Sequence, residues 1–270
     1  MIAQETFRRF TANWGPLALA GLFALLVNMV AGAIGAVAVL PVLLSTGVSF
    51  LRGGGGLDSV AVLVASAGVS MLLMAAAVLL LTPIGLGGLL HGVIQVQRGQ
   101  PASFGELWHA GLRNWTRILV LNLISFLVMI VLVILLLILR LVPILGPLVW
   151  FIGTAMIMLA LGGYGAYIAV SEQVSGVEAA LRALRILSVK FADLLMTLLV
   201  LAAAGLALGL VTAILSRVPI LGSLVPLATQ IVVTPLFMLY LATRYEHNIA
   251  PDLGPPGGQG RFDPGPPPGA

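Results

Sequence analysis

Apolar residues in this chain come in long unbroken runs rather than in an alternating pattern. Between Arg9 and Arg52, 42 consecutive residues include no Asp, Glu, Lys or Arg, and 39 more follow between Asp58 and Arg98. Each run exceeds the roughly 20 apolar residues with which a helix crosses a ~30 Å hydrocarbon layer. Barrel strands alternate apolar and polar residues over about 10 positions. The pattern therefore predicts membrane-spanning helices, which pair their backbone groups internally.

The chain is predicted to be an all-α integral membrane protein with six transmembrane helices. Each expected span is bounded by charges, Gly or Pro, and they cover about residues 17–44, 60–82, 118–139, 144–170, 194–215 and 222–243. The first span follows Arg8 and Arg9, as a signal peptide would. Its apolar stretch is far longer than the about 7 to 15 residues of a signal-peptide core, so we expect an uncleaved signal anchor.

Lys and Arg concentrate in alternate connecting segments. The N-terminal side carries ten of them: Arg8, Arg9, Arg98, Arg113, Arg117, Arg182, Arg185, Lys190, Arg244 and Arg261. The opposite side carries three: Arg52, Arg140 and Arg217. Because cytoplasmic segments are enriched in these cations, both ends are expected in the cytoplasm. An odd number of spans would require, for instance, splitting the first apolar run near Gly32.

Three repeated units, at about residues 1–90, 91–170 and 171–250, are predicted. Ser103 with Glu106 and Ser175 with Glu178 form two capping boxes, and each precedes a span and then a Val-Pro-Ile-Leu-Gly turn. A fainter first copy contains Phe7, Phe10 and Trp14. Each unit is expected to consist of an interfacial amphipathic helix followed by a transmembrane hairpin. Chance similarity between aliphatic segments is the alternative.

Two segments, 103–117 and 175–191, are predicted to lie on the cytoplasmic membrane surface. Each has an apolar stripe at helical spacing with cations beside it. The stripes contain Phe104, Leu107, Trp108, Gly111, Leu112 and Trp115 in the first segment, and Val177, Leu181, Leu184, Leu187 and Phe191 in the second. The residues expected to contact lipid headgroups are Trp108, Arg113, Trp115, Arg117, Arg182, Arg185 and Lys190.

Small and polar residues inside the spans have two interpretations. Gly88 and Gly92, like Gly205 and Gly209, lie four residues apart, which allows close helix packing within the chain or in a homodimer. Scattered polar residues either form interhelical hydrogen bonds or line a path for a neutral solute. They are Asn28, Ser66, Ser70, Asn122, Ser125, Thr154, Thr197, Thr212, Thr229, Gln230 and Thr234.

No residue set for catalysis, cofactor binding or metal binding is recognisable. The chain has no Cys, and His91, His109 and His247 have no second metal ligand at helical spacing. Gly53–Gly56 lacks the Lys-Ser/Thr that follows a phosphate-binding loop. The sequence therefore predicts a non-enzymatic protein without a cofactor.

The C-terminal segment from 251 to 270 differs in composition from the rest of the chain. Pro or Gly occupies 13 of its 20 positions, so we expect a disordered cytoplasmic tail. Hydrophobic residues make up 60% of the whole chain and charged residues 8%, with a mean hydropathy of +1.14, which excludes a soluble globular protein. The pI of about 10.1 comes from dispersed cations, which favour anionic lipids over nucleic acid as partners.

Three segments carry a resemblance to a known group of proteins. They are Pro83–Gly88, Ser175–Arg185 and Leu239–Tyr245. Through them the chain resembles a poorly characterised group of bacterial six-helix membrane proteins, similar to the membrane domain of some glycerophosphodiester phosphodiesterases. The resemblance implies residence in the bacterial cytoplasmic membrane, and it implies no phosphodiesterase activity because no catalytic domain follows.

Two functional classes are compatible with the sequence. The first is a membrane scaffold or accessory subunit that packs with other membrane proteins, with a second copy of itself, or with lipids. The second is a permease or channel for a neutral or lipid-like solute, since many transporters share internal repetition. A connected polar cavity that reaches the bilayer midplane would favour the second class.

Overall fold

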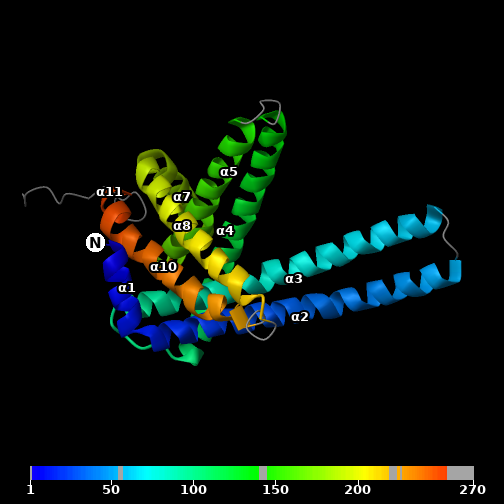
Figure 1. The fold of residues 1–270 in the computed structure, drawn as a ribbon, viewed down its shortest axis with the longest axis horizontal. Helices are drawn as coiled ribbons and strands as arrows, with labels where there is room; N and C mark the ends of the chain where they lie inside the picture. Colours follow the sequence, from blue (N-terminus) through cyan, green and yellow to red (C-terminus); the bar gives the residue numbers. More distant parts are fainter. Residues whose placement is uncertain (1, 54–56, 140–144, 219–223, 226, 254–270) are drawn as a thin grey trace, which may run out of the picture.

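The computed structural model describes residues 2–53, 57–139, 145–218, 224–225 and 227–253. All regular secondary structure in these ranges is helical. The helices form antiparallel hairpins that diverge from a common base, where the N-terminus lies (Figure 1). The predicted turns at 140–144 and 219–222 lie outside the described residues.

The first hairpin is longer than the sequence predicted. The short helix α1 (Ile2–Ala12) precedes α2 (Trp14–Gly53), which packs along α3 (Leu57–Gln97). The candidate membrane span in α2 ends at Val42, close to the expected 44, whereas the span in α3 runs to Gln97 and the expected end at 82 is wrong. Pro83 does not end α3, since a neighbouring helix can satisfy the backbone groups that a proline leaves unpaired.

The second hairpin contains one uninterrupted helix where two were expected. Helix α4 (Phe104–Leu139) includes the whole segment 104–117, so the separate surface helix predicted there is wrong. The capping box is confirmed: the Ser103 amide donates to Glu106 at 2.8 Å, and the Glu106 amide donates to the Ser103 hydroxyl at 3.4 Å. The segment stays in α4 because it packs on protein, with Leu107 and Asn114 fully buried. The chain returns to the base through α5 (Leu145–Met158), the π-helix η1 (Leu159–Gly165) and α6 (Ala166–Ser171).

A separate short helix, α7 (Gly176–Val189), precedes α8 (Phe191–Leu215). The Ser175 hydroxyl accepts from the Glu178 amide at 3.2 Å, as the second capping box predicted. The face of α7 that packs on the protein consists of Ala179, Ala180, Ala183 and Ile186. The predicted stripe is divided: Val177, Leu181 and Phe191 are exposed, whereas Leu184 and Leu187 pack against the core.

The chain returns to the base through η2 (Thr229–Val233), α10 (Thr234–Arg244), η3 (Tyr245–Ile249) and α11 (Ala250–Leu253). Residues 251–253, which the sequence assigned to the tail, belong to α11. Leu253 is buried, and Asp252 pairs with Lys190, so these residues pack on the protein. Residues 254–270 lie outside the described part.

Helices pack closely at Gly88, near the base. A Cβ atom on this glycine would lie 2.2 Å from the Phe23 ring and 2.8 Å from the Leu107 carbonyl oxygen. One on Gly92 would lie 2.6 Å from the Cβ of Ala20. The internal packing expected of this glycine pair is thereby confirmed, and it joins α2, α3 and α4.

Among the residues that the structure describes, five helices are long and apolar enough to cross a membrane: Trp14–Val42, Val64–Gln97, Phe104–Leu135, Val149–Ser171 and Phe191–Leu215. The chain is therefore a multi-pass helical membrane protein. The sixth predicted span, 222–243, falls partly outside the described residues, and its described part contains η2 and α10. The orientation with both ends in the cytoplasm stays a prediction.

Candidate functional site at the base of the hairpins

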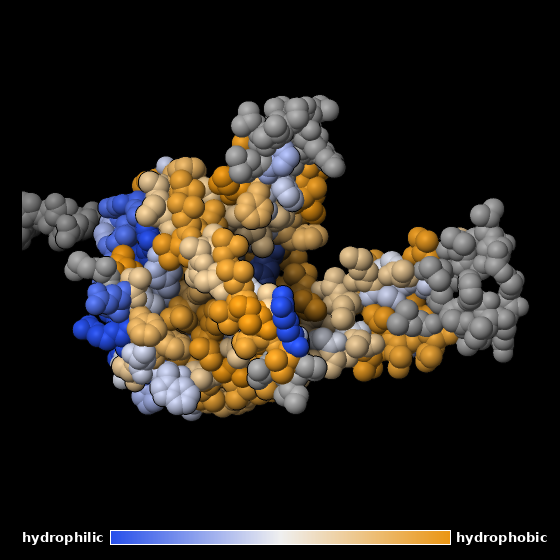
Figure 2. Space-filling view, in the orientation of Figure 1, coloured by the Kyte–Doolittle hydropathy of each residue, from blue (hydrophilic) through white to orange (hydrophobic). Residues whose placement is uncertain are grey.

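Charged side chains gather at the base, and apolar ones cover the hairpins. Figure 2 shows hydrophilic residues at the end of the molecule where α1 and α11 lie, and hydrophobic residues along the helices that extend from it. At this end Arg9 pairs with Glu5 at 2.6 Å, and Lys190 pairs with Asp252. The base therefore has the polarity of a membrane–water interface.

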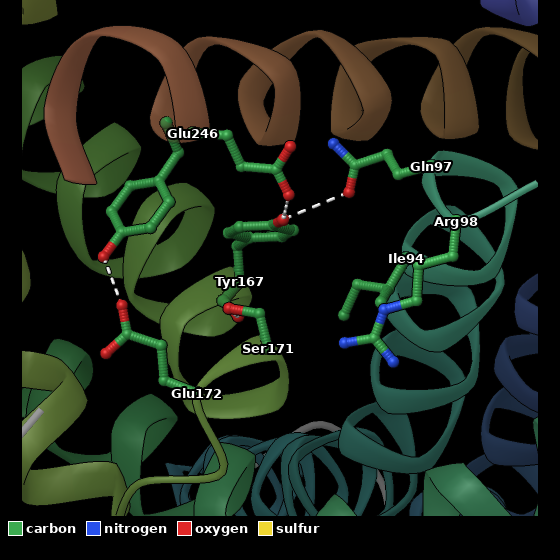
Figure 3. Close-up of a pocket in the computed structure, with 8 residues that line it drawn as sticks. Ile94, Gln97, Arg98, Tyr167, Ser171, Glu172 and Glu246 are labelled. Carbon is green, nitrogen blue, oxygen red and sulfur yellow. Dashed lines mark hydrogen bonds between the residues drawn. The ribbon is translucent and has the colours of Figure 1, made fainter. Parts of the chain in front are cut away.

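A cleft of about 400 Å³ opens in this polar region. It lies where the end of α3 meets α6 and η3 (Figure 3). The residues lining it are Ile94, Gln97, Arg98, Tyr167, Ser171, Glu172, Tyr245 and Glu246. None of the predicted headgroup-binding residues is among them.

Tyr167 stands in the middle of the cleft wall, between α3 and η3. Its hydroxyl lies within hydrogen-bond distance of Glu246 Oε1, at 2.8 Å, and of Gln97 Oε1, at 3.1 Å. A hydroxyl has one proton, and a carboxylate is the stronger acceptor. Tyr167 therefore donates to Glu246, and its contact with Gln97 is a hydrogen bond when the amide is turned so that Nε2 donates to the hydroxyl.

The Glu172 carboxylate is held from two sides. Its Oε1 accepts from the Tyr245 hydroxyl at 2.6 Å, and its Oε2 accepts from the Arg182 guanidinium. Arg182 also lies 3.5 Å from Glu178. Burial raises the pKa of Tyr245 above its usual value, and the hydrogen bond to Glu172 raises it further. Tyr245 is therefore a neutral donor at physiological pH, and the charge of Glu172 is balanced by Arg182.

Arg98 occupies the opposite wall, at the end of α3. The Gly99 amide donates to the Val96 carbonyl at 3.1 Å, and the Gln100 amide donates to the Gln95 carbonyl at 2.9 Å. This is a Schellman motif, which needs a left-handed residue, and Gly99 provides it with φ of 70°. Arg98 is exposed, and among the described residues it makes no ion pair.

π-Helical turns flank the other side of the cleft. η1 ends two residues before Tyr167, and η3 contains Tyr245 and Glu246. A π-turn has one residue more than an α-turn, so it changes the direction of the side chains that follow, and such turns are frequent at functional sites. Tyr167 and Tyr245 consequently meet edge to face, with ring centroids 5.5 Å apart.

A second polar cluster ties α8 to α10 and η1. Arg244 donates to Asp193 at 3.2 Å and to the Tyr240 hydroxyl at 3.0 Å. On the same side of α8, the Thr197 and Tyr164 hydroxyls lie 3.2 Å apart. These groups bond to one another, although the buried Arg244 Nε has no hydrogen-bond partner among the described residues, and we assign them to helix packing.

Some of the predicted headgroup-binding residues contact other residues of the protein, and others are exposed to the surroundings. Trp108 meets Phe23 edge to face and is 43% exposed, and the Trp115 indole N–H donates to the Leu80 carbonyl at 2.6 Å. Arg117 donates to Asn114 and Gln173, and Lys190 contacts Asp252.

Arg113 and Arg185 are exposed, and the part of the chain described here offers them no ion pair. Lipid binding by these residues stays a prediction. Within the described ranges, no group of three or more His, Asp or Glu side chains is placed to hold a metal ion.

No protein-family model, curated protein or solved structure matches this chain. The resemblance drawn from its sequence therefore stays an expectation. The chemistry of the cleft suits the binding of a ligand. The Arg98 cation, which has no ion pair among the described residues, faces carboxylates and aromatic rings across a small open space.

Proposed function

We propose that the chain is a non-enzymatic scaffold or accessory subunit of the bacterial cytoplasmic membrane, and that it binds another transmembrane helix along α8. The observation that carries this proposal is the exposure of α8. None of its most apolar 18-residue stretch is buried inside the protein. Helix α8 packs on α5, α7 and η1 and is joined to α10 near its start through Asp193 and Arg244, whereas η2 packs against α2.

The exposed side of α8 contains small residues at helical spacing. Ala202, Gly205, Gly209 and Ala213 recur every three or four positions and therefore share one face. All four are exposed, and no atom lies within 4 Å of a Cβ built on Gly205 or Gly209.

The surroundings of Gly205 and Gly209 are open, whereas Gly88 and Gly92 pack against neighbouring helices of the same chain. Within a bilayer, helix association depends on close backbone approach rather than on the hydrophobic effect, so a face of small residues favours a helix as neighbour. Lipid chains pack equally well against large side chains, so a face of small residues does not favour lipid as its neighbour.

A pair of matched substitutions tests the proposal. Gly205→Leu places a large side chain on the small face, and Ala207→Leu makes a similar change on α8 away from it. Self-association is measured by single-molecule photobleaching in liposomes, and association with other proteins by quantitative co-purification in mild detergent. Gly205→Leu is expected to reduce at least one of them, and Ala207→Leu neither. Equal behaviour of both variants and the unmodified protein in both measurements would overturn the proposal.

Transport of a neutral solute is the alternative that the sequence allows. The cleft lies at the charged base beside Arg98 and does not reach toward the hairpin turns. Ser70 and Thr154 have buried hydroxyls without a partner among the described residues, but they do not line the cleft. These positions support assembly rather than transport.

A further inference from the structure

We propose that the cleft between α3, α6 and η3 binds a zwitterion that contains a phosphate and an amine, as in the phosphoethanolamine headgroup of a phospholipid. This site is separate from the proposed helix-binding face, since no residue of α8 lines the cleft. The same chemistry occurs in a lipid headgroup and in free phosphoethanolamine.

Two charged residues of the cleft, one positive and one negative, have no ion-pair partner among the described residues. Arg182 balances Glu172, whereas neither Arg98 nor Glu246 has an ion-pair partner among the residues that the structure describes. Arg98 and Glu246 line the same cleft, yet they are not within the 4.0 Å of an ion pair. A ligand with one opposite charge at each end would complement both.

The phosphate end of the ligand is assigned to Arg98. A guanidinium presents a planar fork of N–H donors that matches two phosphate oxygens. Gln97 borders the same wall. Its amide can turn to present Nε2 either to the Tyr167 hydroxyl or to a phosphate oxygen.

The amine end is assigned to the opposite wall. Glu246 supplies the carboxylate, and the Tyr167 hydroxyl fixes its position at 2.8 Å. Tyr167 and Tyr245 add aromatic rings, whose faces attract cations. Figure 3 shows Glu246 and Tyr167 on one side of the space and Arg98 with Ile94 on the other.

The size and place of the cleft suit a headgroup. Its volume of about 400 Å³ is at the lower end of the roughly 300 to 1,000 Å³ of small-molecule sites. A headgroup fits in such a space, whereas a whole phospholipid does not. Because the cleft opens at the polar base of a membrane protein (Figure 2), a lipid could place its headgroup there and leave its acyl chains in the bilayer.

Binding is tested with the full chain in detergent. Native mass spectrometry compares phosphatidylethanolamine with phosphatidylglycerol, which lacks the amine, and calorimetry compares free phosphoethanolamine with inorganic phosphate and with ethanolamine. The zwitterions are expected to bind, and the two half-ligands to bind at least about tenfold more weakly, since each loses one charged contact. Binding of the lipid alone would assign the site to a headgroup, and binding of both to the shared chemistry.

Matched variants locate the binding. Arg98→Gln and Glu246→Gln are each expected to weaken binding about tenfold or more. The amide of Glu246→Gln still accepts from Tyr167, which preserves the wall. Arg8→Gln removes an exposed cation outside the cleft and should leave binding unchanged. The proposal is overturned if phosphatidylglycerol binds as well as phosphatidylethanolamine, if no zwitterion binds, or if Arg98→Gln and Glu246→Gln behave like Arg8→Gln.

Discussion

Single residues fix how closely the helices of the base approach one another. Gly88 lies against the Phe23 ring and the Leu107 carbonyl, where even a methyl group has no room. Gly205 occupies an equivalent sequence pattern, yet its surroundings are open. Glycine spacing alone therefore identifies a surface suited to close packing, and only the tertiary structure tells which surface is already occupied.

Gly88→Ala should lower the free energy of unfolding by about 1 to 3 kcal/mol, because the added methyl group meets a backbone oxygen and a packed ring. Gly205→Ala is the control. It meets no atom and gains helix propensity, so its stability should be unchanged or raised by up to about 1 kcal/mol. Both are measured as unfolding midpoints in one detergent, and equal destabilisation by the two substitutions would contradict the packing described at Gly88.

Tyr245→Phe should destabilise the protein by about 1.5 to 3 kcal/mol at pH 8, because Glu172 loses a hydrogen bond to its charged form. The pKa of Tyr245 is raised in the folded protein. Its contribution is therefore fully present below the unfolded pKa of about 10. It is lost as the pH rises through the folded value.

The difference in unfolding midpoint between Tyr245→Phe and the unmodified protein should therefore shrink above about pH 10. Unfolding followed by circular dichroism from pH 8 to 11 measures it. A difference that stays constant over this range would show that the hydroxyl does not act through its protonated form.

The sequence contains only some of the signals that determine where the helices begin and end. The capping box at Ser103 was predicted correctly, and the Ser175 hydroxyl caps α7 as predicted, because a Ser three residues before a Glu is a local signal. The end of α3 was missed because residues 83–97 include Pro83, His91 and several glycines. Tertiary packing of Gly88 and Gly92 keeps this segment helical. The sequence had no means of showing those contacts.

Trp115→Phe tests how α4 supports α3 at the proline. Its indole N–H donates to the Leu80 carbonyl, in the turn whose backbone ladder Pro83 interrupts. We expect a loss of about 0.6 to 1.5 kcal/mol in stability and faster amide exchange in residues 80–86 of α3. Trp108→Phe keeps an aromatic contact with Phe23 and should leave exchange in this segment unaltered. If residues 80–86 exchange slowly in both variants, the hydrogen bond from Trp115 does not stabilise α3 at the proline.

Helix α7 is expected to lie at the membrane surface, with its exposed apolar residues in lipid. A single tryptophan placed by Leu181→Trp, after Phe replaces the four native tryptophans, reports its depth. Brominated lipids should quench its fluorescence most strongly near the headgroups. Complete accessibility to an aqueous quencher, or quenching at the bilayer centre alone, is incompatible with this placement.

The candidate site belongs to the whole molecule and has no local sequence pattern. Tyr167 contacts Gln97 and Glu246, which lie 70 and 79 residues away along the chain. Glu172 and Glu246 could not be predicted as site residues, because each is an isolated acidic residue near a span end. The signal that the sequence does contain is the scarcity of acidic residues, with 9 Asp and Glu in 270 residues.

The arrangement of charges along the whole chain predicts which side of the membrane carries the cleft. Ten of thirteen Lys and Arg residues fall in the segments assigned to the cytoplasm. Those segments include Arg98, Arg182 and Lys190, which lie at the base with the cleft. If the base faces the cytoplasm, the cleft meets cytoplasmic headgroups and the hairpin turns face outward.

Cysteine labelling on intact cells tests this account most directly, because the chain has no native Cys. Single cysteines replace Ser103 and Ser175, which are exposed at the starts of α4 and α7, and Ser49 and Ser223, whose side chains lie outside the described residues. An impermeant thiol reagent should label positions 49 and 223 only, and permeabilised cells should show positions 103 and 175 to be reactive. Labelling of 103 or 175 from outside would contradict a multi-pass protein whose cleft faces the cytoplasm.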